Sequence, residues 1–251
     1  MDMLAQHETQ SLNIAGTFHI PEGAPNPEFV LPDEVVAYMA AAYGLCKPNM
    51  RGIDPMCGTG TIPRVINRAG GCCDGIDLDP AHVAIARQEV APGRLPLDNG
   101  YIDLANRFKP GSPYGRFALA GEILFGDCTI ITPPNRTRGG KLSPYHYIYT
   151  SIPFSLILAP ELDDRIIQAF DRMLMPGGYL IIDSAEVAER DGLPCHPAAA
   201  TVEIMRRNGY TLRDHVRFNT DSPEGCDSQF SELLFTRTEE FWLDADAILE
   251  T

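Results

Sequence analysis

Residues 53–61 read IDPMCGTGT, and residues 75–80 read GIDLDP. Each stretch ends an apolar run with an acid, Asp54 in the first and Asp77 in the second, and Asp54 is followed by a turn with two glycines. An apolar strand ending in an acid, a glycine turn, a helix and a second strand ending in an acid form a unit that binds nucleoside-type cofactors at the carboxyl edge of a parallel sheet. The two stretches therefore predict a Rossmann-like α/β fold with a cofactor site at that edge.

The glycine turn restricts the kind of cofactor. A dinucleotide fingerprint needs a third glycine three residues after Gly60, where this chain has Pro63, and no lysine follows as in a phosphate-binding Walker loop. Asp54 would repel a phosphate group, whereas it suits the ammonium of a cofactor that carries an amino acid. These residues favour S-adenosylmethionine, although Gly58 and Gly60 are also typical of an ordinary strand-to-helix turn.

Three motifs in the first half of the chain resemble those of the class I S-adenosylmethionine-dependent methyltransferases, and within them the amino-methyltransferases that include the adenine and cytosine DNA methylases. Residues 54–61 are similar to that family's D-P-F-C-G-S/T-G-T loop, with Met56 in place of phenylalanine. The resemblance implies that Asp77 holds the ribose hydroxyls, that Leu78 covers the adenine, and that the acid in residues 126–128 meets the adenine amino group. A looser match over residues 26–32 implies contact with the methionine end of the cofactor. The implied cofactor-binding residues are Phe29, Asp54, Met56, Cys57, Gly58, Thr59, Gly60, Thr61, Asp77, Leu78, Asp127 and Cys128.

A fourth motif, expected to carry the chemistry, lies where another apolar strand ends. Residues 147–154 read YIYTSIPF, which looks like a variant of the family's D/N/S-P-P-Y/F motif with Ile152 in place of the first proline. The resemblance implies that the Ser151 side chain and the Ile152 carbonyl accept hydrogen bonds from the target amine, while Phe154 stacks on the flat base. In the alternative interpretation, Pro153 simply stops a buried strand and Phe154 packs in the core.

The rest of the chain is expected to complete one domain. We expect an N-terminal arm over residues 1–28 and a single methyltransferase domain over residues 29–251, with an insertion at about 91–121 that contains a short helix at 101–108. Further helices are expected after Pro32, Thr61 and Pro80 and over residues 160–173. Strands near residues 210–218 and 230–236 suit a C-terminal antiparallel hairpin. The predicted fold is a seven-stranded, mostly parallel sheet with helices on both faces.

Composition adds expectations about location and metals. The longest apolar stretches of the 251 residues are far below membrane-spanning length, and no signal peptide is recognisable, so we expect a cytoplasmic protein with no membrane contact. Seven cysteines without a C-x-x-C pair suggest reduced, mostly buried thiols. Cys195 and His196 lack a second ligand pair with zinc spacing, so no structural metal is expected.

Charge bears on the substrate. The formal net charge of −14 disfavours a polyanion, and residues 132–141 form the only compact basic patch. The expected activity is N-methylation of an exocyclic amine of a nucleobase in DNA or RNA. Two alternatives stay open: an N-methyltransferase for a small amine or nucleotide-like metabolite, and a catalytically inactive cofactor-binding partner subunit. A protein partner or homo-oligomer also stays open, because the acidic tail at residues 238–244 carries Phe241 and Trp242.

Overall fold

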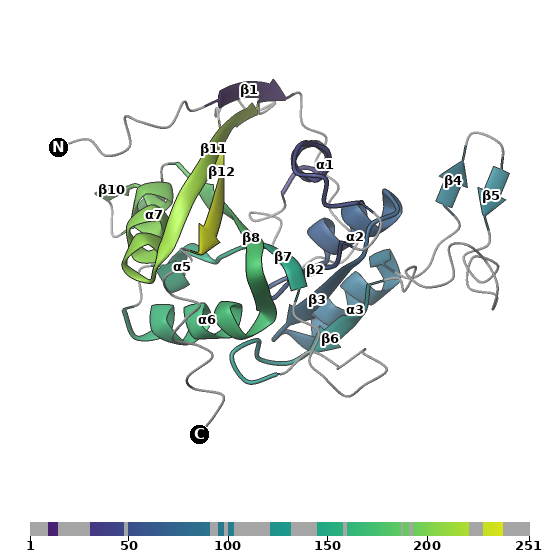
Figure 1. Ribbon diagram of the computed structural model, residues 1–251, viewed down its shortest axis with the longest axis horizontal. Coiled ribbons are helices and arrows are strands. Elements are labelled where there is room, and N and C mark those ends of the chain that lie inside the picture. Colours follow the sequence, from purple (N-terminus) through teal and green to yellow (C-terminus); the bar gives the residue numbers. More distant parts are fainter. Residues whose placement is uncertain are drawn as a thin grey trace. The chain divides into compact units, whose positions relative to one another are not determined.

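Figure 1 shows the computed structural model of the chain. The structure describes residues 10–14, 31–47, 50–90, 95–97, 100–102, 121–131, 145–157, 160–186, 188–190, 193–220 and 228–237. Their elements fall into two compact units, the first comprising Thr17–Cys128 and the second Met1–Gly16 together with Thr129–Thr251. The arm and the single domain from residue 29 stay predictions.

The first unit is an alternation of helices and parallel strands. Its strands pair in the order β2 (Gly52–Asp54), β3 (Cys73–Asp77) and β6 (Ile123–Phe125). Its helices are α1 (Asp33–Ala42), α2 (Thr61–Arg68) and α3 (Pro80–Val90), and α2 and α3 pack against these strands. The three helices expected after Pro32, Thr61 and Pro80 are therefore confirmed.

The predicted insertion contains a short hairpin. Strands β4 (Leu95–Leu97) and β5 (Gly100–Ile102) pair antiparallel. The helix predicted from residue 101 is wrong at its start, because Tyr101 and Ile102 belong to β5, and the remaining residues of that helix lie outside the described part of the chain. Antiparallel pairing of β4 with β5 outweighed the helical pattern there.

The second unit contains the longer strands. Four of them pair in the order β7 (Tyr145–Ser151), β8 (Leu174–Ala185), β12 (Ser228–Arg237) and β11 (Tyr210–Thr220), with β7 and β8 parallel and the other two pairs antiparallel. Helices α5 (Phe154–Ile157), α6 (Pro160–Met173) and α7 (Pro197–Arg207) belong to the same unit. In Figure 1 the long strands curve past α6 and α7, which pack on them. The predicted helix at 160–173 and the C-terminal hairpin are confirmed.

Three further strands of the second unit were not predicted. Strand β1 (Gln10–Ile14) pairs parallel with β11, and β9 (Ala188–Arg190) pairs antiparallel with β10 (Leu193–Cys195). The seven expected strands are β2, β3, β6, β7, β8, β11 and β12. Strand β1 is an eighth strand beside them, because it pairs with β11. The fold class is the predicted one, a Rossmann-like α/β fold with mostly parallel strands and a C-terminal antiparallel hairpin.

Each unit has its own core. In the first unit Cys57, Val83, Ala86, Val90 and Ile123 form one buried cluster, so the glycine loop is anchored on α3 and β6. In the second unit the largest fully buried side chains are those of Tyr145, Tyr147, Tyr149, Phe170, Phe218 and Phe235. Burial of these large side chains fixes the strand register in the second unit.

Candidate functional site

The predicted cofactor loop begins at the end of β2. Asp54 is 2% exposed, and its Oδ1 accepts a hydrogen bond from the Met56 N–H at 3.2 Å. This local bond turns the chain immediately after the strand, as aspartate commonly does. The Cys57 N–H then donates to the Ile76 carbonyl at 2.8 Å, which fastens the loop to β3.

Asp77 joins the two predicted acidic motifs. Its Oδ2 accepts a hydrogen bond from the Gly58 N–H at 2.7 Å, and its Oδ1 accepts one from the Asp79 N–H at 2.9 Å. His82 Nδ1 lies 3.3 Å from the same Oδ1. The structure therefore brings together the glycine loop after β2 and the acid that ends β3.

The two glycines of the loop have different reasons to be glycine. Gly58 has φ +51°, and no atom of the described residues lies within 4 Å of where a Cβ would be, so these residues leave open space beside the loop. Gly60 has φ +88°, and a Cβ there would lie 2.9 Å from the Ala86 Cβ. Gly60 thus permits α2 to approach α3, while Gly58 leaves room for a ligand. Of the flanking residues, Met56 and Thr59 are half-buried and Thr61 is buried as the first residue of α2.

The third predicted motif lies at the end of β6. The Gly126 N–H donates to the Asp77 carbonyl at 2.9 Å, which fixes the turn that leads to Asp127 and Cys128. Burial, followed by the negative charge of Asp127, raises the pKa of the Cys128 thiol to about 11. Cys128 therefore stays a neutral thiol at physiological pH.

Apolar side chains are exposed beside these acids. Leu78, directly after Asp77, is 67% exposed, and Phe125, the last residue of β6, is 55% exposed. Exposed apolar residues next to carboxylates that accept hydrogen bonds suit a ligand with a flat base and a sugar. Phe29, the remaining predicted cofactor residue, lies outside the described residues.

A buried arginine supports this site, and sequence reasoning missed it. Arg64 on α2 is 1% exposed and donates to both carboxylate oxygens of Asp33 on α1, at 2.7 and 2.6 Å. Its Nε lies 3.7 Å from Glu89 on α3. A bidentate pair of this kind holds the three helices together behind the glycine loop. The signal was a lone arginine inside the otherwise apolar run at residues 62–66.

The predicted catalytic residues lie at the end of β7, in the second unit. Ser151 is the last residue of β7, and the chain passes through Ile152 and Pro153 into α5, which begins at Phe154. The Phe154 side chain lies outside the described residues. The Pro153 carbonyl accepts the Leu156 N–H at 2.8 Å, which starts the helix immediately after the motif.

The Ile152 side chain is half-buried and faces other apolar side chains. It lines an apolar cavity together with Leu156 and Ile157 of α5, Ile166 of α6 and Met205 of α7. Unlike the proline of the resembling motif, Ile152 keeps a backbone N–H and an unlocked φ angle.

Two buried carboxyls next to Ser151 were not among the predicted site residues. Ser151 Oγ donates to Asp183 Oδ2 on β8 at 2.8 Å. Burial raises the pKa of Asp183 to about 6, against the opposing effect of this hydrogen bond. Glu232 on β12 is 0% exposed, and its pKa is also raised, by burial and by the charge of Asp183. The available signal was the run YLIID at residues 179–183, which ends an apolar strand in an acid as the runs at Asp54 and Asp77 do.

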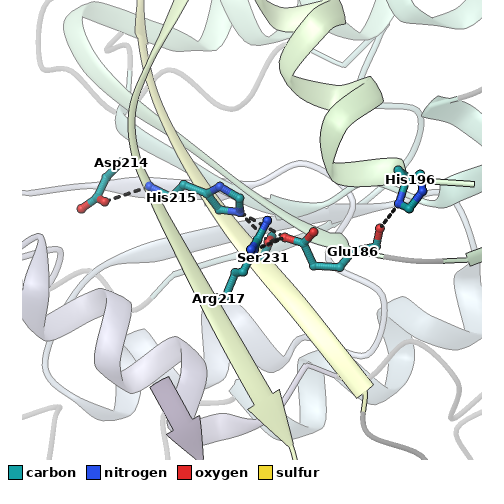
Figure 2. A network of polar contacts seen from close by, with 6 residues as sticks. All are labelled: Glu186, His196, Asp214, His215, Arg217 and Ser231. Carbon is teal, nitrogen blue, oxygen red and sulfur yellow. Dashed lines mark hydrogen bonds and ion pairs between the residues drawn. The ribbon is translucent and has the colours of Figure 1, made fainter. Parts of the chain in front are cut away.

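Figure 2 shows a second polar network in the same unit, centred on Glu186. Glu186 Oε1 accepts hydrogen bonds from Arg217 Nε at 3.0 Å and from the Ser231 hydroxyl, and lies 3.1 Å from His215 Nε2. His215 Nε2 also lies 2.7 Å from Ser231 Oγ. Because one nitrogen of His215 faces both partners, the arrangement is not that of a serine nucleophile with a base oriented by an acid.

The remaining expectations concern metals, thiols, membranes and two charged segments. No group of histidine, cysteine and acidic side chains in the described part of the chain could hold a metal ion. The six cysteines in that part, Cys46, Cys57, Cys72, Cys73, Cys128 and Cys195, are free thiols, and four of them are buried. Among the described helices, none is long and apolar enough to cross a membrane. The basic patch at residues 132–141 and the tail at 238–244 lie outside the described ranges.

No protein-family model matches the sequence, and no curated protein matches it. Solved structures do match. A S-adenosylmethionine-dependent methyltransferase from Methanosarcina mazei has a TM-score of 0.54 and 13% identity, over 79% of this chain and 98% of that chain.

Two other structures are similar to a comparable degree. The glycopeptide N-methyltransferase MtfA has a TM-score of 0.53 and 10% identity, over 81% of this chain and 95% of that chain. A candidate RNA methyltransferase from Pyrococcus horikoshii has a TM-score of 0.50 and 11% identity, over 82% and 84% of the two chains. The fold is therefore that of the class I S-adenosylmethionine-dependent methyltransferases. Within this class, the resemblance to the DNA adenine and cytosine methylases stays a prediction.

Proposed function

We propose that the protein is a S-adenosylmethionine-dependent N-methyltransferase that transfers a methyl group to an exocyclic amine of a nucleobase in DNA or RNA. The observation that carries this proposal is the bond from the Gly58 amide to the Asp77 carboxylate. It assembles the glycine loop and the second acidic motif in a methyltransferase fold. The motif at Ser151 supplies the acceptor side of the reaction.

The residues of the first unit fit S-adenosylmethionine. The open space beside Gly58 leaves the loop accessible, and exposed Leu78 offers an apolar surface for adenine. Asp77 already faces two N–H groups and His82, but a carboxylate has about four acceptor positions, so a ribose hydroxyl can still donate to it. Neutral Cys128 adds a small apolar surface after Asp127. When bound, the cofactor supplies an electrophilic methyl group on a positively charged sulfur.

The residues of the second unit fit a planar amine. Ser151 Oγ and the Ile152 carbonyl can accept hydrogen bonds from the two N–H groups of the amine. Phe154 would stack on the ring that carries the amine. With both N–H bonds held, the nitrogen lone pair is free to attack the methyl carbon. Methyl transfer to such a nitrogen depends chiefly on alignment, so these residues need to orient the amine rather than to act as a strong base.

The choice of nucleobase over small amine rests on the motif at residues 151–154 and on the shared fold with the candidate RNA methyltransferase. The net charge of −14 favours the second candidate, a small amine or nucleotide-like metabolite, because a nucleic-acid enzyme usually presents a basic surface. A third function, cofactor binding without catalysis, would place the protein as the partner of an active subunit. Binding of DNA or RNA would require the basic residues at 132–141 or a partner protein.

The test is a transfer assay with S-adenosylmethionine labelled on its methyl group. The purified protein is incubated separately with unmethylated DNA, RNA and a small-amine extract, and cofactor affinity is measured by calorimetry. Label in DNA or RNA supports the nucleobase assignment, and label only in the amine fraction moves the substrate to the second candidate. Cofactor binding without transfer to any pool favours the inactive partner, and absence of cofactor binding overturns the proposal.

Two variants separate the roles of the units. Asp77→Ala should weaken cofactor binding more than it lowers turnover at saturating cofactor, whereas Phe154→Ala should do the reverse. Asp79→Asn is the matched control, because asparagine can still accept the Ala81 N–H hydrogen bond that starts α3. Equal effects of Asp77→Ala and Phe154→Ala on both quantities would count against the assignment.

A further inference from the structure

The hydroxyl of Ser151 has a fixed partner. Ser151 and Asp183 lie opposite each other in the parallel pair of β7 and β8, and Ser151 Oγ donates to Asp183 Oδ2 at 2.8 Å. Asp183 is 7% exposed, and among the described residues its other oxygen, Oδ1, is buried without a hydrogen-bond partner. A buried carboxylate that is only half satisfied calls for an explanation.

The groups that face Asp183 come from both neighbouring strands. Ser151 and Tyr149 share one face of β7, because side chains alternate along a strand, and Glu232 on β12 lies opposite Asp183. The Tyr149 hydroxyl donates to Glu232 Oε1 at 2.7 Å, while Oε2 is buried and has no partner within the described residues. Among the described residues, no lysine or arginine forms an ion pair with Asp183 or Glu232. Two carboxyls this close and this buried resist being ionised together.

We propose that Asp183 is a positioning residue for methyl transfer: it holds the proton of the Ser151 hydroxyl, so that Ser151 accepts a hydrogen bond from the substrate amine, and it receives the surplus amine proton through Ser151. This role rests on the proposed function. Asp183 acts through Ser151 and need not touch the substrate.

Asp183 can make Ser151 a hydrogen-bond acceptor because a hydroxyl group has only one hydrogen to donate. A serine hydroxyl has one hydrogen and two acceptor lone pairs. If its hydrogen were free to turn toward the substrate, it could bond to the nitrogen lone pair that must attack the methyl group. With the hydrogen donated to Asp183, only the lone pairs of Ser151 face outward, and they hold an amine N–H instead.

The second part follows from the proton balance. When the new N–C bond forms and the C–S bond breaks, the nitrogen becomes positively charged and carries one surplus proton. Ser151 Oγ takes that proton while its own hydroxyl proton moves to Asp183 Oδ2, which leaves a neutral methylated amine and a neutral carboxylic acid. The raised pKa of Asp183, about 6, leaves the group ionised at neutral pH and a better proton acceptor than an ordinary aspartate.

The test compares Asp183→Asn and Asp183→Ala, with turnover and KM measured on whichever of the DNA, RNA and small-amine pools takes label from the wild-type protein. Asparagine keeps an oxygen that can accept the Ser151 hydroxyl but cannot take a proton. Asp183→Asn should lower kcat about 100-fold with little change in KM, and Asp183→Ala should lower it further. The wild-type kcat should fall below about pH 6, and this fall should be absent in Asp183→Asn.

The control is Asp171→Asn, which alters a half-buried pair of the second unit, in which the Tyr210 hydroxyl donates to Asp171 at 2.6 Å and Arg237 forms an ion pair with the same carboxylate. This change should leave kcat and its pH profile unaltered. A double variant of Ser151→Ala and Asp183→Asn should be no slower than Ser151→Ala alone, because the two residues act as one unit. Wild-type kcat in Asp183→Asn, or an unchanged pH profile, overturns the role of Asp183.

A titration without turnover keeps the inference distinct from the proposed function. Carbon-13 NMR of labelled aspartate should show Asp183 titrating near pH 6, and Ser151→Ala should raise that pKa further because it removes the hydrogen bond that lowers it. An Asp183 that titrates near pH 4 and does not respond to Ser151→Ala overturns the inference. A wild-type protein that shows the titration but transfers no label overturns the proposed function instead.

Discussion

Two acids near the end of β8, Asp183 and Glu186, have opposite surroundings. Glu186 Oε1 is approached by Arg217, His215 and Ser231, and these hydrogen bonds, led by that of His215, lower the pKa of Glu186 to about 2 (Figure 2). Among the residues that the structure describes, Asp183 has one donor, Ser151, and burial raises its pKa to about 6. The two acids are three residues apart in the sequence and belong to the same unit.

These surroundings imply that the Glu186 carboxylate stabilises the fold, whereas the Asp183 carboxylate costs stability. A buried polar group that is fully hydrogen-bonded stabilises its surroundings, whereas one with an unpaired oxygen costs stability. Proteins keep such unpaired groups mainly where a ligand or a reaction uses them. We therefore assign Glu186 to structure and Asp183 to function.

The largest expected effect is on stability, from Glu186→Ala. Removal of the carboxylate leaves buried His215 and Ser231 without their shared partner, and the free energy of unfolding should fall by about 3 kcal/mol in urea titrations. The control is Glu203→Ala on α7, where both members of the pair with Arg206 are 55% exposed. That change should have little effect on stability, because water and salt screen an exposed pair. Equal losses in the two variants would contradict the structural role of Glu186.

The second prediction concerns acid pH. Because the pKa of folded Glu186 lies below that of the unfolded chain, its contribution to stability is present above about pH 4.5 and is lost as the pH falls toward 2. Asp183 has the opposite sign, since its folded pKa is raised, and stability falls as the pH rises from about 4 to about 6. Melting temperatures measured from pH 7 to pH 3 should show less acid loss in Glu186→Gln than in the wild type. If Glu186→Gln lost as much melting temperature at acid pH as the wild type, groups other than Glu186 would be responsible for that loss.

The third prediction is a stabilising substitution at Asp183. Asp183→Asn removes a buried charge, so the free energy of unfolding should rise by about 1–2 kcal/mol at pH 8 and change little near pH 3.5, where the wild-type acid is already neutral. Chemical unfolding at the two pH values measures this difference. A gain in stability together with the loss of turnover would identify Asp183 as a residue kept for function. A loss of stability at pH 8 would show that the Asp183 carboxylate stabilises the fold, as the Glu186 carboxylate does.

The sequence predicted the first unit better than the second. The acids and glycines at residues 53–61 and 75–80 interact locally and through adjacent parallel strands, so their spacing alone predicted that the two stretches meet at one edge of the sheet. Helix α1 begins with two acids after Pro32 and α3 begins with Pro80, so local start signals predicted both helices, while α2 followed from the glycine turn before it.

The contacts of the second unit depend on pairing between distant strands. Ser151 and Asp183 meet through the register of β7 with β8, and Asp183 and Glu232 meet through the register of β8 with β12. The three residues are far apart in the sequence, so no local pattern indicates that they share one face. Strand β1 was also not predicted, because it pairs with β11 across about 200 residues of sequence, a separation that local propensity does not encode.

The smallest effect tests which donors hold Glu186. The Arg217 side chain is 43% exposed, whereas those of His215 and Ser231 are buried, so water can replace Arg217 but cannot replace the other two. Arg217→Gln should therefore lower the free energy of unfolding by only about 0.5 kcal/mol, and 1 M NaCl should remove most of this difference by screening. The larger cost of Glu186→Ala should persist in the same salt, because it comes from buried partners that water and salt do not reach. If Arg217→Gln cost as much as Glu186→Ala, the ion pair would hold the carboxylate, and the contrast with Asp183 would then depend on the presence of an arginine rather than on buried hydrogen bonds.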